Sequence, residues 1–303
     1  MKNKLTICIF SFNRGRFLRN CVESILACIP DAEIAIFDDN SSDPETCSYL
    51  EEAKKNCRVI TPDIKGTIKH GGLYHNMNTA LELYRSHSLL CFLQDDTQVV
   101  RPLPSDEIQA FESLFEAHPK LGFIHPCFIR GIDLVKRPVT PEPGPAPEFF
   151  FRKHMGQSAG VHYSDLVVFK PDRLTVAGWG FQQSEPSNDQ QAKHLFGVMA
   201  YMWLPFAMWL PDVPAYRGKN KTLGLRLAEK KKQVGFYPFN LWSKELTEAR
   251  LKSSQGCLPV AEELLECSPV TPPKPWTYNP LTGFRLFKNL NTAEVALRRW
   301  LRR

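Results

Sequence analysis

The sequence lacks the usual signals of metal fingers, secretion and membrane spanning. Its nine cysteines are odd in number and include no CxxC pair, a usage typical of reduced cytosolic thiols. The apolar run LTICIF leads directly into SFNRGR with no small-residue cleavage site, which indicates a first strand and not a signal peptide. The uncharged segment 195–210 is interrupted by Pro205 and is shorter than the roughly 20 residues that cross a bilayer, so we expect buried core there. We therefore expect a cytoplasmic protein.

A nucleic-acid partner is also not expected. The formal net charge is only +6, and no element typical of groove reading or base stacking is present. The excess charge gathers near the C-terminus, where one acid, Glu294, stands against Lys288, Arg298, Arg299, Arg302 and Arg303. The same segment carries an apolar stripe at helical spacing, formed by Ala293, Leu297, Trp300 and Leu301. It is either a solvated helix end or a contact with an anionic surface, such as the inner face of the membrane.

The order of apolar and polar segments predicts an α/β fold. Apolar residues make up 43% and charged residues 23% of the 303 residues, an ordinary globular composition. Short apolar runs alternate with helical patterns, as in βαβ units, and the expected strands span 5–10, 33–37, 58–60 and 89–93. A helix is expected from Ser105, and a proline-rich extended or mobile loop, either a substrate flap or a surface excursion, over 136–148.

Polar clusters follow three of the predicted strands. Ser11, Phe12, Asn13 and Arg14 follow the first, Asp38 and Asp39 open the second cluster, and Gln94, Asp95 and Asp96 form the third. Ligands of open α/β sheets bind outside the carboxyl ends of the strands. One such cluster is ordinary turn chemistry, whereas three on one edge predict a binding site.

The segments LTICIFSFN, IAIFDDNSSD and LLCFLQDDT resemble, in this order, the motifs of the GT-A glycosyltransferases of family two. The resemblance implies a Rossmann-like nucleotide-binding sheet with a fused acceptor-binding half, and we place these at 1–102 and 103–225, followed by a C-terminal helical extension at 226–303. It also implies a nucleotide-sugar donor, with Asp39 accepting a hydrogen bond from the base, usually uracil. The donor-binding residues implied around it are Ser11, Phe12, Asn13, Asp38, Asp95 and Asn78, the last resembling the Asn that begins the helix before the metal strand.

Asp95 and Asp96 are the candidate metal ligands. A hard divalent ion such as Mn²⁺ or Mg²⁺, held by one or two carboxylates, can neutralise a departing diphosphate. Asp96 is the first candidate, and Asp95 would bind ribose or a metal-bound water. The alternative is that the pair only ends a strand and begins a turn.

Basic residues provide further candidates for contact with the diphosphate. Lys65 lies in a glycine-containing loop that lacks the GxxxxGK[ST] spacing of a P-loop. Many family members place a metal-binding His where this chain has Arg217 and Lys219. Either water completes the metal shell, or these cations contact the diphosphate, or the dependence on metal is weaker than usual.

An inverting transfer to a hydroxyl of a saccharide or glycolipid needs a carboxylate base. Gly178 to Phe181 resembles the acceptor loop of the family, and Asn188-Asp189 resembles its acidic pair. Asp189 is the first candidate for the base and Glu185 the second; alternatively, Asn188 or Asp189 only begins a helix. The other functions considered are a GT-A-like protein that binds without turnover and a sugar nucleotidyltransferase.

Overall fold

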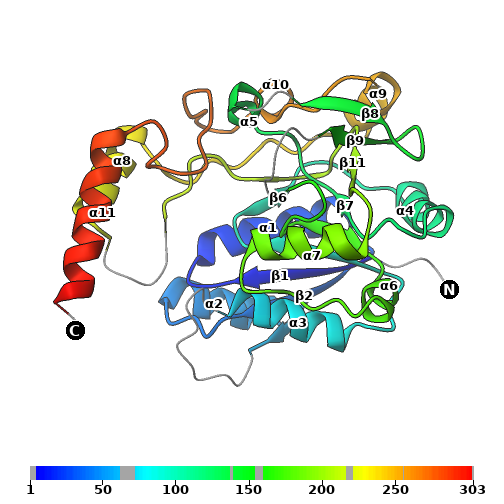
Figure 1. The fold of residues 1–303 in the computed structure, drawn as a ribbon, viewed down its shortest axis with the longest axis horizontal. Coiled ribbons are helices and arrows are strands. Elements are labelled where there is room, and N and C mark those ends of the chain that lie inside the picture. Colours follow the sequence, from blue (N-terminus) through cyan, green and yellow to red (C-terminus); the bar gives the residue numbers. More distant parts are fainter. Residues whose placement is uncertain are drawn as a thin grey trace.

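A computed structural model describes residues 5–61, 72–136, 139–153, 160–215, 221–254 and 256–301. Within these residues, Figure 1 shows helices packed around a central sheet, with a pair of helices at one end of the molecule. The predicted α/β class is therefore confirmed. Lys65, Arg217 and Lys219 lie outside the described residues.

The N-terminal part of the sheet is parallel and carries the expected strands. Its order is β3-β2-β1-β5, and the strands span Arg58–Ile60 (β3), Glu33–Asp38 (β2), Leu5–Ser11 (β1) and Leu89–Gln94 (β5). β1 is buried along its whole length, as expected for a strand covered on both faces. The register pairs Ser11 with Asp38 and Phe10 with Gln94, so the three polar clusters meet at one edge.

The sheet continues without a break into the predicted acceptor half. The next strands, in spatial order, are Val167–Phe169 (β10), Ile124–His125 (β7), Ala200–Met202 (β11), Phe149–Lys153 (β9) and Thr140–Pro143 (β8). β10 runs antiparallel to β5 and β7, whereas β11 is parallel to β7. A separate two-stranded sheet joins Thr97–Val99 (β6) to Ala207–Trp209 (β12). The functional division at residues 102 and 225 stays a prediction; residue 225 lies inside a helix.

The helices of the first 120 residues follow the strands. They are Gly15–Cys28 (α1), Pro44–Ala53 (α2), Leu73–Leu83 (α3) and Ser105–Ala117 (α4). α3 begins five residues before Asn78, where we expected it to start. Its N-cap position is Gly72, which makes no side-chain capping bond, so the sequence carries no capping signal there.

The remaining helices lie in the second part of the chain, and the last is the longest of the described helices. They are Gly131–Lys136 (α5), Pro171–Val176 (α6), Glu185–Leu195 (α7), Leu223–Lys232 (α8), Lys244–Ser253 (α9), Ala261–Leu264 (α10) and Arg285–Trp300 (α11). Among the described residues, no helix combines the length and the apolar character that crossing a bilayer requires.

Part of the proline-rich segment is a strand, where we expected an extended or mobile loop. Instead of a loop, Thr140–Pro143 is a strand that pairs antiparallel with β9. Proline cannot donate to a ladder and is tolerated at a sheet edge, and β8 is the last strand of the sheet.

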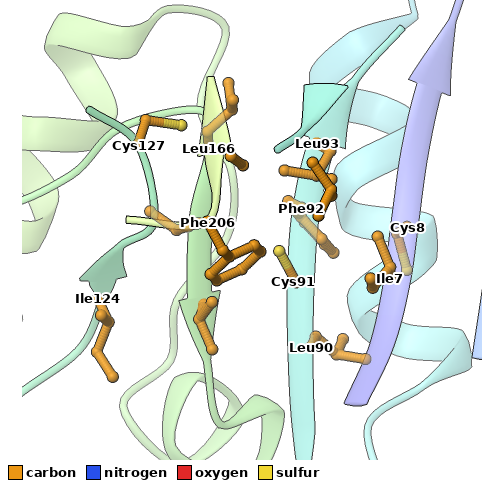
Figure 2. Packing of buried hydrophobic residues seen from close by; sticks show 14 of the residues in the cluster. Ile7, Cys8, Leu90, Cys91, Phe92, Leu93, Ile124, Cys127, Leu166 and Phe206 are labelled. Atoms are coloured by element: carbon orange, nitrogen blue, oxygen red, sulfur yellow. The ribbon is translucent and has the colours of Figure 1, made fainter. Parts of the chain in front are cut away.

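One apolar core joins the two parts of the sheet. Figure 2 shows Ile7 and Cys8 of β1, Leu90, Cys91, Phe92 and Leu93 of β5, and Ile124, Cys127, Leu166 and Phe206 from the elements beyond it. The segment 195–210 contributes β11, Phe206 and β12, and most of it is buried as expected; Leu195 is exposed, and Gly197, Val198 and Trp209 are half-buried. All nine cysteines are unpaired, as expected.

Candidate active site

Asn13 ties the loop after β1 to the loop after β2. Its backbone has a φ of 51°, a left-handed conformation that Asn adopts more readily than most residues. This turns the side chain so that Oδ1 accepts from the backbone N–H groups of Ser42 (2.7 Å) and Asp43 (2.8 Å), while Asn13 N–H donates to Ser41 Oγ (2.8 Å). Asn13 is buried, and its role is to fix two loops at the candidate donor site.

The adjacent acids Asp38 and Asp39 have different environments. Asp38 is buried and accepts from Ser41 N–H (2.7 Å) and Ser41 Oγ (2.6 Å). Burial raises the pKa of Asp38, although the Ser41 bonds oppose the shift. Asp39 is half-buried; its N–H donates to Ser11 O (2.9 Å) and its Oδ2 accepts from Gly72 N–H (2.6 Å). Asp39 is thus the member of the pair that is open to a ligand.

Asp95 and Asp96 share one guanidinium, that of Arg14. Arg14 Nη1 forms a short ion pair with Asp96 Oδ2 and lies 3.4 Å from Asp95 Oδ1, and Nη2 donates to the carbonyl of Pro214 (3.4 Å). Asp95 Oδ2 also accepts from Phe12 N–H (3.0 Å). Burial raises the pKa of Asp95, and Arg14 opposes this. Burial would lower the pKa of Arg14, but the two carboxylates reverse the shift and raise it.

The Asp pair fits a divalent cation. Asp96 Oδ1 is a buried oxygen with no hydrogen-bond partner, and carboxylate oxygens are the ligands that Mg²⁺ and Mn²⁺ prefer. Within the described residues, no three His, Cys, Asp or Glu side chains gather into a fuller ligand set. One or two carboxylates, supplemented by phosphate and water oxygens, suffice for Mg²⁺ in nucleotide sites. The cation would have to share the pair with Arg14 or displace it.

Asn78 connects the predicted donor side to the predicted acceptor loop. Its amide bonds both peptide groups of Phe181: Nδ2 donates to Phe181 O (3.0 Å) and Oδ1 accepts from Phe181 N–H (2.8 Å). The predicted acceptor loop is therefore fixed by a residue of α3. This helix begins directly after Gly72, whose N–H donates to Asp39.

Asp189 anchors a loop. Its Oδ1 accepts from four consecutive backbone N–H groups at 2.8–3.1 Å, those of Gly160, Val161, His162 and Tyr163. Asn188 is buried and bonds Gln182 at both its O (3.1 Å) and N–H (2.6 Å). Neither residue begins the helix, because α7 starts at Glu185 with Ser184 as its cap. The capping alternative is therefore wrong.

Glu185 belongs to a cluster of acids and tyrosines at the start of α7. The hydroxyls of Tyr74 (3.2 Å) and Tyr163 (3.0 Å) donate to Asp165. Burial raises the pKa of Asp165 to about 6. Burial, and then the neighbouring Asp165, raise the pKa of Glu185 to about 7, a value suited to a proton acceptor at neutral pH. Tyr74, which also interacts with Glu185, lies two residues after Gly72, so this cluster adjoins the donor side.

A cavity of about 410 Å³ opens beside Arg14. Its wall includes Asn13, Arg16, Phe17, Phe236 and Lys221. Lys221 follows directly on the segment of Arg217 and Lys219, whose proposed diphosphate contacts stay a prediction. Lys65 likewise stays a prediction.

Arg14 and Asp165 were missed by the sequence analysis. Arg14 had a signal, since it is the last residue of the first polar cluster and a cation is needed wherever two carboxylates are buried together. Asp165 had none, because its partner Tyr74 lies 91 positions away in the chain, and the sequence gives no sign that the nearby Tyr163 donates to it.

Solved structures with similar chains include three glycosyltransferases. TarS 1–349 of S. aureus is 11% identical with a TM-score of 0.45, and the match covers 68% of this chain and 60% of TarS. The mannosyltransferase PcManGT from Pyrobaculum calidifontis, in complex with GDP-Man and Mn²⁺, is 16% identical over 75% of this chain and 61% of its own, with a TM-score of 0.45. GalNAc-T7, with UDP, GalNAc and Mn²⁺, is 11% identical over 76% and 48%, with a TM-score of 0.46. This chain thus spans about three fifths of the TarS 1–349 chain.

No curated protein matches the sequence. The family comparison does find a match, and it covers the strand ends that carry Asp39, Asp95 and Asp96. Residues 6–160, just over half of the chain, match Glycosyl transferase family 2, and the chain belongs to this family.

Proposed function

We propose that this protein transfers a sugar from a nucleotide-diphosphate donor, a UDP-sugar, to a hydroxyl of a saccharide or glycolipid, with inversion at the anomeric carbon. The single observation that carries the proposal is the convergence of Asp39, Asp95 and Asp96 at one edge of a parallel sheet, in a chain of this family. Fold alone would not support an activity, whereas this arrangement of charges can bind a donor.

The nucleoside would lie against Asp39 and the half-buried Phe12. The carboxylate of Asp39 would accept the N–H of uracil, and its bond to Gly72 N–H holds it in place for that contact. Gly72 permits this approach, because a Cβ there would overlap the Asp39 carboxylate. Asn13 would support both contacts by fixing the two loops.

The diphosphate would lie against Asp95, Asp96 and Arg14. A divalent ion held by Asp96, with Asp95, would neutralise the negative charge of the leaving group. Arg14 would add a guanidinium, a group that binds phosphate oxygens well. The divalent ion and the guanidinium would both be positive, and the leaving diphosphate gains negative charge.

We propose Glu185 as the base. As the acceptor oxygen attacks the anomeric carbon, its proton would pass to the Glu185 carboxylate, while the bond to the diphosphate breaks and leaves its electron pair on the diphosphate oxygen. Asp189, our first candidate from the sequence, has one oxygen occupied by four N–H groups, which leaves Oδ2 alone for that task. The assignment of either carboxylate stays a proposal.

The test is a screen of nucleotide sugars by thermal shift, with and without Mn²⁺, followed by assays of turnover. A bound donor raises the melting temperature, because binding stabilises the native state by RT ln(1 + [L]/Kd). We expect UDP and a UDP-sugar to stabilise the protein more with Mn²⁺ than without it. Stabilisation by UDP with no turnover on any donor and acceptor pair would favour the alternative, a protein that binds without catalysis.

A further inference from the structure

The last helix forms a unit with α8 at one end of the molecule. In Figure 1, α8 and α11 lie side by side, away from the central sheet. Thr222 Oγ1 donates to Asn291 Oδ1 (2.7 Å), and Leu223 N–H donates to Glu294 Oε2 (2.6 Å). At Gly224 a Cβ would overlap the carbonyl oxygen of Phe287, so the two backbones are in close contact. One face of α11 therefore packs against α8.

A second face of α11 is apolar and exposed. The predicted stripe exists, but none of its residues packs on the core, and α11 has no buried residue at all. Trp300 is 71% exposed and Leu297 54%. The exposed large apolar side chains of the pair are Leu223 and Leu227 on α8 and Leu286, Leu290, Leu297 and Trp300 on α11. Neighbouring exposed apolar side chains of this kind mark an interaction surface.

The polar side of the pair is positively charged. Arg285, Lys288 and Arg299 are exposed on α11, and α8 ends in three lysines. The one acidic residue of α11, Glu294, is already bonded to Arg298 (2.6 Å) and to Leu223 N–H. An occupant of this surface must therefore be apolar in part and anionic in part.

An anionic lipid surface meets both conditions. A helix with Leu and Trp on one face and Lys and Arg on its polar face buries its apolar side at the headgroup boundary and attracts anionic lipids. Tryptophan is also enriched at that boundary, since its ring is amphipathic. A second copy of this chain would bring two positive faces together, which is unfavourable.

We propose that the α8–α11 pair docks the protein on a membrane surface that contains anionic lipid. This inference goes beyond the proposed function and does not depend on it. It requires Leu297 and Trp300 to enter the lipid interface and the neighbouring basic residues to lie at the headgroups.

The experiment is co-sedimentation of the full chain with vesicles. We expect binding to vesicles of equal parts phosphatidylcholine and phosphatidylglycerol, weaker binding at high salt, and little binding to phosphatidylcholine alone, because the attraction to anionic headgroups is screened by salt. A wild-type protein that does not bind the anionic vesicles at low salt would overturn the proposal.

Two sets of variants separate this surface from general stickiness. Leu297→Ser with Trp300→Ser should lower the partition coefficient at least about tenfold, because both side chains would lose their burial in lipid. Its control, Val176→Ser with Val270→Ser, removes two exposed apolar side chains elsewhere and should leave the partition coefficient unchanged.

The second set removes positive charge. Arg285→Gln, Lys288→Gln and Arg299→Gln together should lower binding by on the order of 10². Lys244→Gln, Arg250→Gln and Lys252→Gln on α9 are the matched control.

Equal losses in the variants and their controls would overturn the proposal. So would sedimentation equilibrium showing a dimer that the Leu297 and Trp300 double variant dissociates, because the occupant would then be a second copy. Stabilisation by UDP should be the same in all variants, so a failure of lipid binding can be told apart from a failure of donor binding.

Discussion

The guanidinium of Arg14 lies directly on the carboxylate of Asp96, the residue that we propose as metal ligand. Both side chains are largely buried, and the same guanidinium reaches Asp95 at 3.4 Å. The guanidinium of Arg14 therefore lies at the position where a divalent ion would bind to the two acids. Metal binding and the Arg14 ion pair should compete.

Replacing Arg14 should make this competition measurable. In Arg14→Gln the repulsion between the guanidinium and a divalent ion is gone, so we expect Mn²⁺ alone to bind at least about tenfold more tightly. The free Mn²⁺ signal in electron paramagnetic resonance titrations gives the affinity without any assay of activity. Arg16→Gln is the control, since Arg16 lines the same cavity but lies over the Phe236 ring, 4.2 Å from its centroid. Weaker Mn²⁺ binding in Arg14→Gln would mean that Arg14 instead holds the carboxylates in place for the ion.

Asp39→Asn should weaken the binding of UDP. The amide oxygen can still accept from Gly72 N–H, so the loop stays in place while the charge is lost. We expect a loss of about 1.5–3 kcal/mol in binding free energy, the usual range for a hydrogen bond to a charged group. Isothermal titration calorimetry with UDP measures it. Glu45→Gln, an exposed acid on the wall of the neighbouring cavity, should leave the affinity unchanged. Unchanged affinity in a folded Asp39→Asn protein would contradict the nucleoside assignment.

The sequence was sufficient for the parallel half of the fold. The apolar runs at β1, β2 and β5 predict buried strands because helices cover both faces, and the polar residues after them converge because parallel strands end at one edge. The edge strand β8 could not be predicted, since a run with Pro141 and Pro143 forms a strand only when a partner such as β9 lies beside it.

The sequence predicted which residues form the candidate site, but it did not predict most of the contacts that these residues make. The sequence shows that a carboxylate follows a strand, but it does not show which donors or cations that carboxylate binds. Asp189 illustrates this, because its four N–H donors come from a segment 26–29 residues earlier in the chain. The Arg14 ion pair similarly joins residues 81–82 positions apart, and only the register of β1 with β5 brings them together.

Arg101 should be the most important charged residue for stability. It is fully buried, pairs with Glu107 at 2.7 Å, and donates to the carbonyls of Pro205 (3.0 Å) and Leu204 (2.6 Å). It thus connects the end of the predicted donor half to the segment between β11 and β12. Arg101→Met leaves Glu107 without its partner, and removing one member of a buried pair costs about 3–5 kcal/mol of unfolding free energy. Urea denaturation measures the change.

The control for Arg101 is Arg85→Met. Arg85 forms an ion pair with Glu82 at 3.2 Å, but both side chains are exposed, and such pairs contribute about 0–1 kcal/mol. A similarly small loss in Arg101→Met would show that Glu107 finds other partners and that the contact between the two segments is not stabilising.

Glu185→Gln and Asp189→Asn should separate the base from the anchor. If Glu185 takes the acceptor proton, Glu185→Gln should lower kcat by the ~10²–10⁴ typical of general-base loss. Asp189→Asn keeps an oxygen for the four N–H groups and should retain most of the turnover. Donor affinity, measured by calorimetry with UDP, should be unchanged in both variants.

The pH dependence gives an independent check on Glu185. A base must be ionised to act, so wild-type kcat/KM should fall as the pH drops below about 7, the pKa of Glu185, and this limb should vanish in Glu185→Gln.

The stability of the folded protein should respond to pH in the opposite sense. Native Glu185 holds its proton up to about pH 7, whereas the unfolded chain loses it near the usual 4.5, so ionising Glu185 costs native stability as the pH rises between these values. The stabilisation of Glu185→Gln relative to wild type should therefore be larger at pH 8 than at pH 4. If Asp189→Asn abolishes turnover in a folded protein while Glu185→Gln retains it, the roles are reversed and Asp189 is the base.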